Sequence, residues 1–383
     1  MKASRNPRIA WLIPFVPLGH YWPPILEAFL RIFPRTKVFS CIPSGYPWVY
    51  FVGRVRRFIV RNQDRSCRWA IILLPLMRMV VRLAFLRPKI VFVGGFNLWT
   101  AVSVLMKPLL KFRLVTVFDG SSPAADGRGK KALIRYRTWI ARQSDALITN
   151  SREGAAYLSR FLSVAGDKIF SSPYLVPSAF VLDRDGGPPD LHGLTRPIFL
   201  FVGRVSHLKG MGTLLEACAE LLRRGHSAFG LMVIGGGYER KNYHELARRL
   251  NVEKMVRWEG RVAYGRLAAY YRACDVLVFP TLTDVWGMAA LEAMIFSKPV
   301  ISSRAAGVSD LITDGVNGFL MDPEKPRALA DIMEKFIMDP ALARRLGEKL
   351  SDLHKRMNPV SAAESLSNVV RYVQHPGHTG GNI

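Results

Sequence analysis

Short apolar runs that read as buried strands alternate with helix-like stretches along nearly the whole chain of 383 residues. In the first half these strand-like runs lie at Ile9–Phe15, Ile90–Val93, Leu114–Phe118 and Ala146–Thr149. The second half restarts with IFLFVGRV at Ile198–Val205 and repeats the pattern. Alternation of this kind is typical of βα units, in which parallel strands lie between layers of helices. The sequence therefore predicts an α/β fold.

A segment rich in Gly, Pro and Asp, LDRDGGPPDLHGLTRP, separates the two halves and shows no periodicity. The chain is too long for one ordinary core, and its 49% of hydrophobic residues suffices for two. We predict two Rossmann-like domains, at residues 1–182 and 198–360, with a linker at 183–197, a C-terminal helix at 361–374 and a disordered tail at 375–383.

The charge is strongly positive, with 54 Lys and Arg against 29 Asp and Glu and a net charge of +25. Such an excess implies an anionic partner: nucleic acid, an anionic membrane or phosphorylated substrates. From Arg54 to Arg87 nine arginines stand against one acid, and Arg78 and Arg82 are spaced i,i+4 in an apolar run. A basic amphipathic segment on an anionic membrane is the favoured interpretation. The alternatives are a partly buried helix with solvated arginines and a nucleic-acid surface, for which no recognition module is present.

The cysteines and histidines predict no metal site. The cysteines are scattered and form no CxxC pair, at Cys41, Cys67, Cys218 and Cys274. This usage fits a reducing, cytosolic location. The basic N-terminus precedes an apolar run that mimics a signal peptide, but prolines interrupt the run and no small-residue cleavage site follows. We expect a first strand there, not a secretion signal.

Two cations lie where a strand gives way to a helix in VGRVSHLKGMGTLLEA. Arg204 stands at the end of the strand and Lys209 at the start of the helix. A helix N-terminus favours an anion, and an added guanidinium and ammonium suit a diphosphate. The alternative is two solvated cations on a basic protein. A second strand-to-helix turn, VIGGGYER, carries Gly235 and Gly236. It admits a phosphate or is a plain tight turn, and it is not the GxGxxG of a nicotinamide site.

Two carboxylates, Asp284 and Glu292, lie eight positions apart in TLTDVWGMAALEAMIFSKPVI. Asp284 precedes a helix-like run and Glu292 lies inside it. That run is apolar almost all round, so a buried acid there needs a partner. Carboxylates accept hydrogen bonds from hydroxyl groups, including those of sugars. The pair predicts a site for a polyhydroxyl ligand, and a solvated helix residue is the alternative for Glu292.

Four features of the second half occur in this order: VGRVSHLKG, then VIGGG, then VRWEGRV before CDVLVFP, and last the acid pair followed by GVSDLITDGVNGFL. With these features the second half resembles the donor domain of the retaining glycosyltransferases of family 4. The resemblance covers about residues 198–340. It implies the GT-B fold, with two Rossmann-like domains facing across a cleft, and places the acceptor on residues 1–182. It also implies a metal-independent reaction, with no cofactor beyond a UDP- or GDP-linked sugar donor.

The resemblance assigns roles residue by residue. Arg204 and Lys209 hold the donor diphosphate and stabilise the charge that develops on it. Glu292 holds the ribose, and Asp284 contacts the transferred sugar. The family has Glu where this chain has Asp284, which leaves the identity of the sugar open, and Asp310 also stands in place of a Glu. The implied donor site also includes the glycine turn and the residues after the first acid, Gly235, Gly236, Val285, Trp286 and Gly287.

The first half matches the family in layout alone. Gly19 and His20 occupy the place of a glycine loop that faces the donor phosphates. Asp119 and Asp126 stand where many members carry a His, and Asp119, directly after a strand, is our candidate catalytic residue; a turn-capping Asp is the alternative. The segment Asp183–Asp185, DRD, resembles a metal-binding DxD but lies in the linker.

The combined interpretation is a retaining glycosyltransferase at the cytoplasmic face of the membrane. Its acceptor is expected to be a glycan or glycolipid, such as a lipid-linked saccharide, a lipopolysaccharide or a cell-surface polysaccharide intermediate. Two alternatives stay open at this point. One is a nucleotide-sugar epimerase on the same scaffold, and the other is a basic nucleic-acid-binding protein without turnover.

Overall fold

The computed structural model describes residues 6–13, 21–43, 55–60, 68–122, 126–184 and 187–375; for residues 40–43, 55–60 and 68–75 it describes the backbone. The chain divides into two compact units. Unit 1 comprises Met1–Ser121, Asp126–Leu175 and Pro359–Ile383, and unit 2 comprises Ser122–Ala125 and Val176–Asn358.

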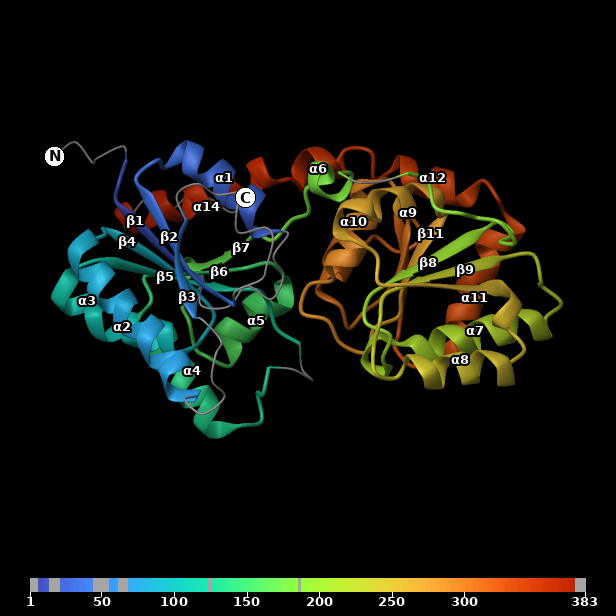
Figure 1. Ribbon diagram of the computed structural model, residues 1–383, viewed down its shortest axis with the longest axis horizontal. Coiled ribbons are helices and arrows are strands. Elements are labelled where there is room, and N and C mark those ends of the chain that lie inside the picture. The colour runs from blue at the N-terminus through green and yellow to red at the C-terminus, as the bar shows by residue number, and fades with distance from the viewer. Residues whose placement is uncertain are drawn as a thin grey trace. The chain divides into compact units, whose positions relative to one another are not determined.

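Unit 1 is built on a seven-stranded parallel sheet with the order β3-β2-β1-β4-β5-β6-β7. The strands are β1 (Ile9–Ile13), β2 (Thr36–Pro43), β3 (Val55–Val60), β4 (Ile90–Gly94), β5 (Arg113–Phe118), β6 (Ala146–Thr149) and β7 (Ile169–Ser171). The helices are α1 (Trp22–Ile32), α2 (Arg68–Leu86), α3 (Leu98–Leu110), α4 (Lys131–Gln143), α5 (Arg152–Arg160) and α14 (Pro359–Gln374). Right-handed crossovers place α2, α3, α4 and α5 on one face of the sheet and α1 on the other (Figure 1). Because helices cover both faces, β1 and β4 are continuous apolar runs.

Unit 2 repeats this plan with a six-stranded parallel sheet in the order β10-β9-β8-β11-β12-β13. The strands are β8 (Ile198–Val202), β9 (Gly230–Ile234), β10 (Val256–Gly260), β11 (Val276–Phe279), β12 (Val300–Ser303) and β13 (Gly318–Met321). The α-helices are α6 (Ala179–Leu182), α7 (Met211–Arg223), α8 (Arg240–Arg249), α9 (Leu267–Ala273), α10 (Met288–Ile295), α11 (Pro326–Met338), α12 (Leu342–Glu348) and α13 (Leu353–Arg356). Both strand orders are those of a doubly wound Rossmann sheet, as the sequence predicts.

The C-terminal helix α14 belongs to unit 1, although the chain reaches it from unit 2. It packs against α1, and the two helices, red and blue, lie side by side in Figure 1. Its buried face includes Ala363, Leu366 and Val370, spaced for one side of a helix. The sequence predicted this helix at 361–374 as a separate element. The disordered tail predicted at 375–383 lies, apart from His375, outside the described residues.

The linker predicted at 183–197 lies within unit 2, whose boundary is at Val176. Asp183 accepts two hydrogen bonds of 2.7 Å from the Arg272 guanidinium, and Arg257 pairs with Asp190 at 3.1 Å. The described residues of this segment form neither helix nor strand. These ion pairs bind it to the second unit. Of the DRD motif, Asp183 is held by Arg272, and Asp185 lies outside the described residues.

Candidate active site

The predicted donor residues lie at the point where the strand order of unit 2 reverses. The chain passes from β8 to β9 and β10 on one side, then returns to the other side of β8 with β11. In open α/β sheets ligands bind beyond the carboxyl ends of the strands at such a reversal. Arg204 and Lys209 lie on the loop after β8, and Asp284 lies on the loop after β11. The topology thus explains why residues 75 positions apart in sequence meet.

Lys209 and Asp284 form an ion pair, with 2.5 Å between Nζ and Oδ2. Their side chains are 28% and 18% exposed, so the pair is partly shielded from water. The other carboxylate oxygen, Oδ1, accepts a hydrogen bond of 3.1 Å from the backbone N–H of Trp286. The sequence predicted both residues for the site but did not predict that they pair with each other.

The loops that carry these residues are joined by backbone contacts. Lys209 ends the short 3-10 helix His207–Lys209, and Gly210 follows with φ at 72°. A Cβ at Gly210 would lie 2.0 Å from the carbonyl oxygen of Pro280, so only glycine allows this approach. The backbone N–H of Leu282 donates to the carbonyl of Leu208 at 2.9 Å, and the Thr281 hydroxyl donates to the same carbonyl. The position of Lys209 is therefore set by the loop that carries Asp284.

A third loop supports Asp284 from the other side. Asp284 pairs with Ala306 as an isolated parallel bridge, and the backbone N–H of Gly307 donates to the Asp284 carbonyl at 3.1 Å. A Cβ at Gly307 would lie 2.4 Å from the carbonyl oxygen of Val285. Of the residues after the acid, Trp286 is buried and Gly287 adopts a φ of 99° at the start of α10. Asp310 lies further along the same supporting loop, in the 3-10 helix Gly307–Leu311.

Glu292 lies inside α10 and is only 2% exposed. Its carboxylate accepts a hydrogen bond of 2.6 Å from the Tyr271 hydroxyl and one of 3.0 Å from the Tyr264 hydroxyl. The sequence predicted that an acid in so apolar a helix needs a partner, and these tyrosines are partners it did not identify. Both lie in the stretch YGRLAAYYRAC, seven positions apart, a spacing that places them on one side of a helix.

The glycine turn after β9 packs against the loop after β8. The backbone N–H of Val205 donates to the Gly236 carbonyl at 3.0 Å. Gly235 has a φ of 135°, and a Cβ there would lie 1.8 Å from the carbonyl oxygen of Gly203. A Cβ at Gly237 would likewise lie 2.1 Å from the carbonyl oxygen of Val205, so Gly235 and Gly237 have a packing role whether or not a phosphate binds. Arg204, on the loop that they support, is exposed.

In unit 1, Asp119 follows β5 directly and accepts a hydrogen bond of 2.6 Å from the Tyr174 hydroxyl. Water reaches the side chain, yet protein atoms crowd the carboxylate. Burial therefore raises the pKa of Asp119, while the bond from Tyr174 acts to lower it.

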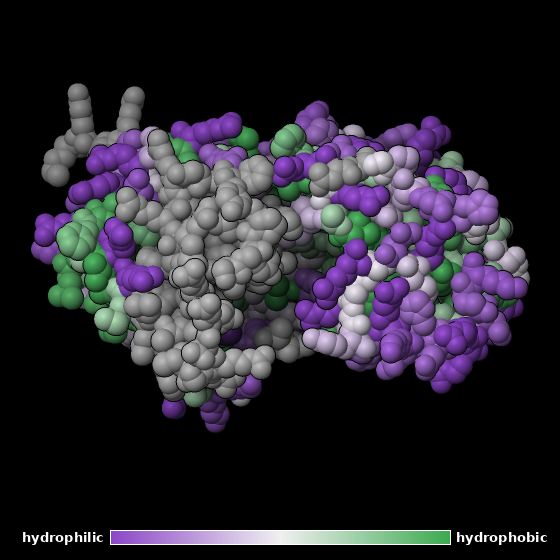
Figure 2. Space-filling model, viewed as in Figure 1, coloured by the Kyte–Doolittle hydropathy of each residue, from purple (hydrophilic) through white to green (hydrophobic). Residues whose placement is uncertain are grey.

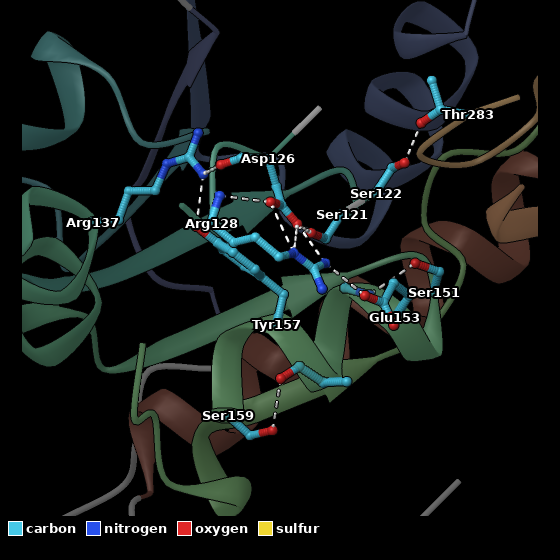
Figure 3. A network of polar contacts seen from close by, with 12 residues as sticks. Ser121, Ser122, Asp126, Arg128, Arg137, Ser151, Glu153, Tyr157, Ser159 and Thr283 are labelled. Carbon is cyan, nitrogen blue, oxygen red and sulfur yellow. Dashed lines mark hydrogen bonds and ion pairs between the residues drawn. The ribbon is translucent and has the colours of Figure 1, made fainter. Parts of the chain in front are cut away.

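Asp126 is part of an ion-pair network in unit 1, shown in Figure 3. The Arg128 guanidinium donates to both of its carboxylate oxygens, at 3.1 Å to Oδ1 and 2.7 Å to Oδ2, and also pairs with Glu153 at 2.8 Å. The Ser121 hydroxyl donates to Asp126 at 2.5 Å. Burial acts to raise the pKa of Asp126, but the bonds from Arg128 and Ser121 outweigh it and lower the pKa. Asp126 is therefore a structural residue. Gly19 and His20 lie outside the described residues.

Solved structures with the same two-unit fold cover nearly the whole chain. The Anabaena protein HepE in complex with UDP has a TM-score of 0.77 and 17% identity, over 95% of this chain and 99% of that chain. Sucrose-phosphate synthase from Thermosynechococcus elongatus has a TM-score of 0.73 and 21% identity, over 96% and 99% of the two chains. At these identities the similarity establishes the fold alone. The fold is that of the GT-B class, as the sequence predicts.

The sequence of unit 2 matches a family of glycosyltransferases. Residues 189–351 match the family described as glycosyl transferases group 1. A D-inositol 3-phosphate glycosyltransferase of Nocardiopsis dassonvillei is 29% identical over 256 residues, 63% of this chain and 58% of that protein. The enzyme of that name from Streptomyces scabiei is 31% identical over 258 residues, 63% and 56% of the two. The chain thus spans less than two thirds of the length of these relatives. Through residues 189–351 the chain is similar to the glycosyl transferases group 1 family.

Proposed function

We propose that the chain is a retaining glycosyltransferase that moves a sugar from a nucleotide diphosphate sugar to a membrane-associated acceptor. The Lys209–Asp284 pair at the strand-order reversal carries this proposal. In this pair the Lys209 ammonium, a cation suited to the diphosphate, lies beside the Asp284 carboxylate, which can accept hydrogen bonds from sugar hydroxyl groups. Both residues lie within the region that matches the family. UDP is the first donor nucleotide to test, because the related HepE structures hold UDP and UDP-glucose; GDP remains the alternative.

The proposed reaction breaks the bond between the anomeric carbon and the leaving phosphate oxygen. A bond forms from the acceptor oxygen to the same face of that carbon, and the acceptor proton passes to the leaving phosphate. Arg204 and Lys209 stabilise the negative charge that develops on the diphosphate, as fixed cations do at other developing charges. Asp284 orients the sugar and Glu292 the ribose. Asp119 is assigned a catalytic role in unit 1.

The net charge supports the proposed acceptor and location. A net charge of +25 favours an anionic surface, so the acceptor is placed at a membrane, as a lipid-linked saccharide, a lipopolysaccharide or a polysaccharide intermediate. The peripheral location is assigned to the cytoplasmic face, where nucleotide sugars are available.

The test is a panel of UDP- and GDP-linked sugars, scored first by thermal stabilisation of the full chain and then by hydrolysis. The donor that stabilises the chain most is next incubated with candidate glycolipid acceptors in excess chelator. We expect transfer to persist and the new linkage to keep the donor's anomeric configuration by NMR. An inverted linkage, or transfer that stops on chelation, contradicts the retaining, metal-independent mechanism.

The same panel separates the two alternatives. An epimerase would release a free, isomerised sugar nucleotide in the absence of any acceptor. A nucleic-acid-binding protein would turn over no donor and would shift DNA or RNA in a salt-dependent way.

A further inference from the structure

The outer face of α3 in unit 1 carries no charged residue. Its exposed or partly exposed positions include Leu98, Val102, Leu105 and Leu109, spaced so that they form one continuous stripe. Leu105 is 63% exposed and Leu109 80% exposed. The one charged side chain of α3, Lys107, points to unit 1 itself, where it pairs with Asp145 at 2.8 Å. A helix on the surface of a water-soluble domain normally presents a polar outer face, so this stripe calls for a partner.

The neighbouring helix α2 extends the apolar surface and adds charge. Met77, Val81 and Phe85 recur every four residues on its outer side, and Phe85 is 83% exposed. A parallel row, one position further along, carries Arg78 and Arg82, which are also exposed. The two helices contact each other in the layer that covers one face of the sheet. Figure 2 shows hydrophobic side chains, in green, gathered where α3 lies in Figure 1.

The third helix of this layer, α4, adds exposed basic residues and Trp139, which is 36% exposed. The sequences of α2, α3 and α4 contain no Asp or Glu, whereas they contain several Arg and Lys. The surface is therefore both apolar and positive, without the acids that neutralise basic residues on most protein surfaces. We define the apolar face as Met77, Val81, Phe85, Leu98, Leu105 and Leu109.

We propose that the apolar face is the surface by which unit 1 docks on an anionic lipid bilayer. The proposal deepens the proposed function, on which it rests for the membrane-bound acceptor. Apolar side chains enter the boundary between headgroups and acyl chains, while Arg78 and Arg82 remain at the level of the lipid phosphates. Of the segment Arg54–Arg87 predicted to dock on the membrane, the proposal uses Met77, Arg78, Val81, Arg82 and Phe85; the side chains of residues 54–75 lie outside those described.

Charge favours a bilayer over a second copy of this chain. Two such faces in contact would bring basic helices together without acids to pair with them, whereas anionic lipid supplies the opposite charge. The mode is attachment to one leaflet. α3, with 13 residues, is about 20 Å long. None of the helices within the described ranges is both long and apolar enough to cross a membrane.

The test is co-sedimentation of the full chain with vesicles that contain phosphatidylglycerol, compared with vesicles of phosphatidylcholine alone. One variant combines Phe85→Ser, Leu105→Ser and Leu109→Ser; because these side chains are exposed, it is expected to fold. Its partition onto anionic vesicles should fall at least about 100-fold at every salt concentration. A second variant, Arg78→Gln with Arg82→Gln, should lose roughly fivefold per arginine at low salt and much less at high salt.

The matched control replaces three exposed apolar residues elsewhere, Phe180→Ser, Met338→Ser and Val360→Ser, and should bind vesicles like the wild type. The proposal is overturned if the variant with Phe85→Ser, Leu105→Ser and Leu109→Ser binds anionic vesicles as strongly as the wild type. It is also overturned if the wild type binds phosphatidylcholine vesicles and anionic vesicles equally. A dimer by light scattering that this variant abolishes, without vesicle binding, shows that a second copy is the occupant instead. Nucleotide affinity, measured in solution without vesicles, should not change in any variant. Vesicle binding through this face without nucleotide binding would reject the proposed function and leave the docking surface standing.

Discussion

The Lys209 ammonium and the Asp284 carboxylate, 2.5 Å apart, come from loops that follow different strands and meet beside the reversal in strand order. The cation proposed for the diphosphate is therefore neutralised before the donor arrives. Under the proposed function, a phosphate oxygen of the donor competes with Asp284 for the Lys209 ammonium. Weakening of the ion pair would then free Asp284 to accept a hydrogen bond from the sugar. The ion pair would thus link binding of the donor phosphate by Lys209 to binding of the sugar by Asp284.

This competition predicts opposite effects on binding and turnover in Asp284→Asn. The change removes the anion that competes for Lys209, so the affinity for UDP or inorganic diphosphate should stay the same or rise by up to about tenfold. Turnover of the sugar donor should fall, because the sugar loses a charged acceptor. Lys209→Ala should weaken the same ligands by roughly 1.5–3 kcal/mol, the cost of one charge-assisted hydrogen bond. Calorimetry with UDP and diphosphate measures both effects.

The matched control is Asp322→Asn, which breaks another lysine–aspartate pair of unit 2, with Lys325 at 3.2 Å. It should change neither binding nor turnover. A loss of diphosphate affinity in Asp284→Asn would mean that Asp284 positions Lys209 and does not compete with the ligand.

Strong local patterns in the sequence were enough to predict most of unit 2. The runs at Ile198 and Val276 are buried on both faces of a parallel sheet, so they are apolar without interruption. The buried run at Val300 begins with two apolar residues and ends with two serines. In unit 1 the strands β2, β3 and β7 were not predicted. β2 and β3 carry Lys and Arg among their apolar residues, and β7 has only three residues, so none of the three gives a clear strand pattern.

The sequence predicted which residues belong to the candidate site, but it did not predict which of them contact one another. Glu292 was identified because an acid is costly in an apolar helix. Its partners Tyr264 and Tyr271 lie on a different element, and tyrosine is common in any core, so no local signal marks them. The pairing of Lys209 with Asp284 depends on the order of strands in the sheet, which a single sequence does not reveal.

The hydroxyl of Tyr271 is predicted to support both stability and nucleotide binding through Glu292. Tyr271→Phe leaves a buried carboxylate with one bond fewer, which should lower the free energy of unfolding by roughly 1–3 kcal/mol. Because Glu292 is proposed to hold the ribose, UDP should bind more weakly while inorganic diphosphate is unaffected. Thermal unfolding and calorimetry with the two ligands measure the two effects.

Tyr270→Phe is the matched control on the same helix, since the Tyr270 hydroxyl donates to Glu259 at 3.2 Å instead of to Glu292. It should leave the ratio of UDP to diphosphate affinity as in the wild type. Equal changes in both variants would show that any lost hydroxyl in this helix perturbs the nucleotide, and would remove the specific role of Glu292.

Gly235 is predicted to stabilise the fold independently of any ligand. Gly235→Ala forces an L side chain to a φ of 135° and sets its Cβ against the carbonyl of Gly203. We expect the free energy of unfolding to fall by about 1–3 kcal/mol or more, measured by urea titration. Gly166→Ala is the control, because its added Cβ meets no atom within 4 Å. If Gly235→Ala melts like the wild type but loses donor binding, the glycine serves the phosphate and not the packing of the two loops.

The two acids after β5 are predicted to respond to pH with opposite signs. The folded pKa of Asp126 is lowered from 3.8, so its contribution to stability is present above that value and is lost as pH falls through the folded pKa. The folded pKa of Asp119 is raised from 3.8, so its ionisation costs stability as pH rises through and beyond that value. Asp126→Asn should therefore lower the free energy of unfolding at pH 7 and flatten its fall in acid.

Asp119→Asn keeps an oxygen that accepts from Tyr174, and it should raise the free energy of unfolding at pH 7. If Asp119 acts in catalysis, this more stable variant should also lose turnover. Urea unfolding from pH 3 to 7 checks the signs; a loss of stability at pH 7 in Asp119→Asn would contradict a raised pKa, and full turnover would assign Asp119 to structure.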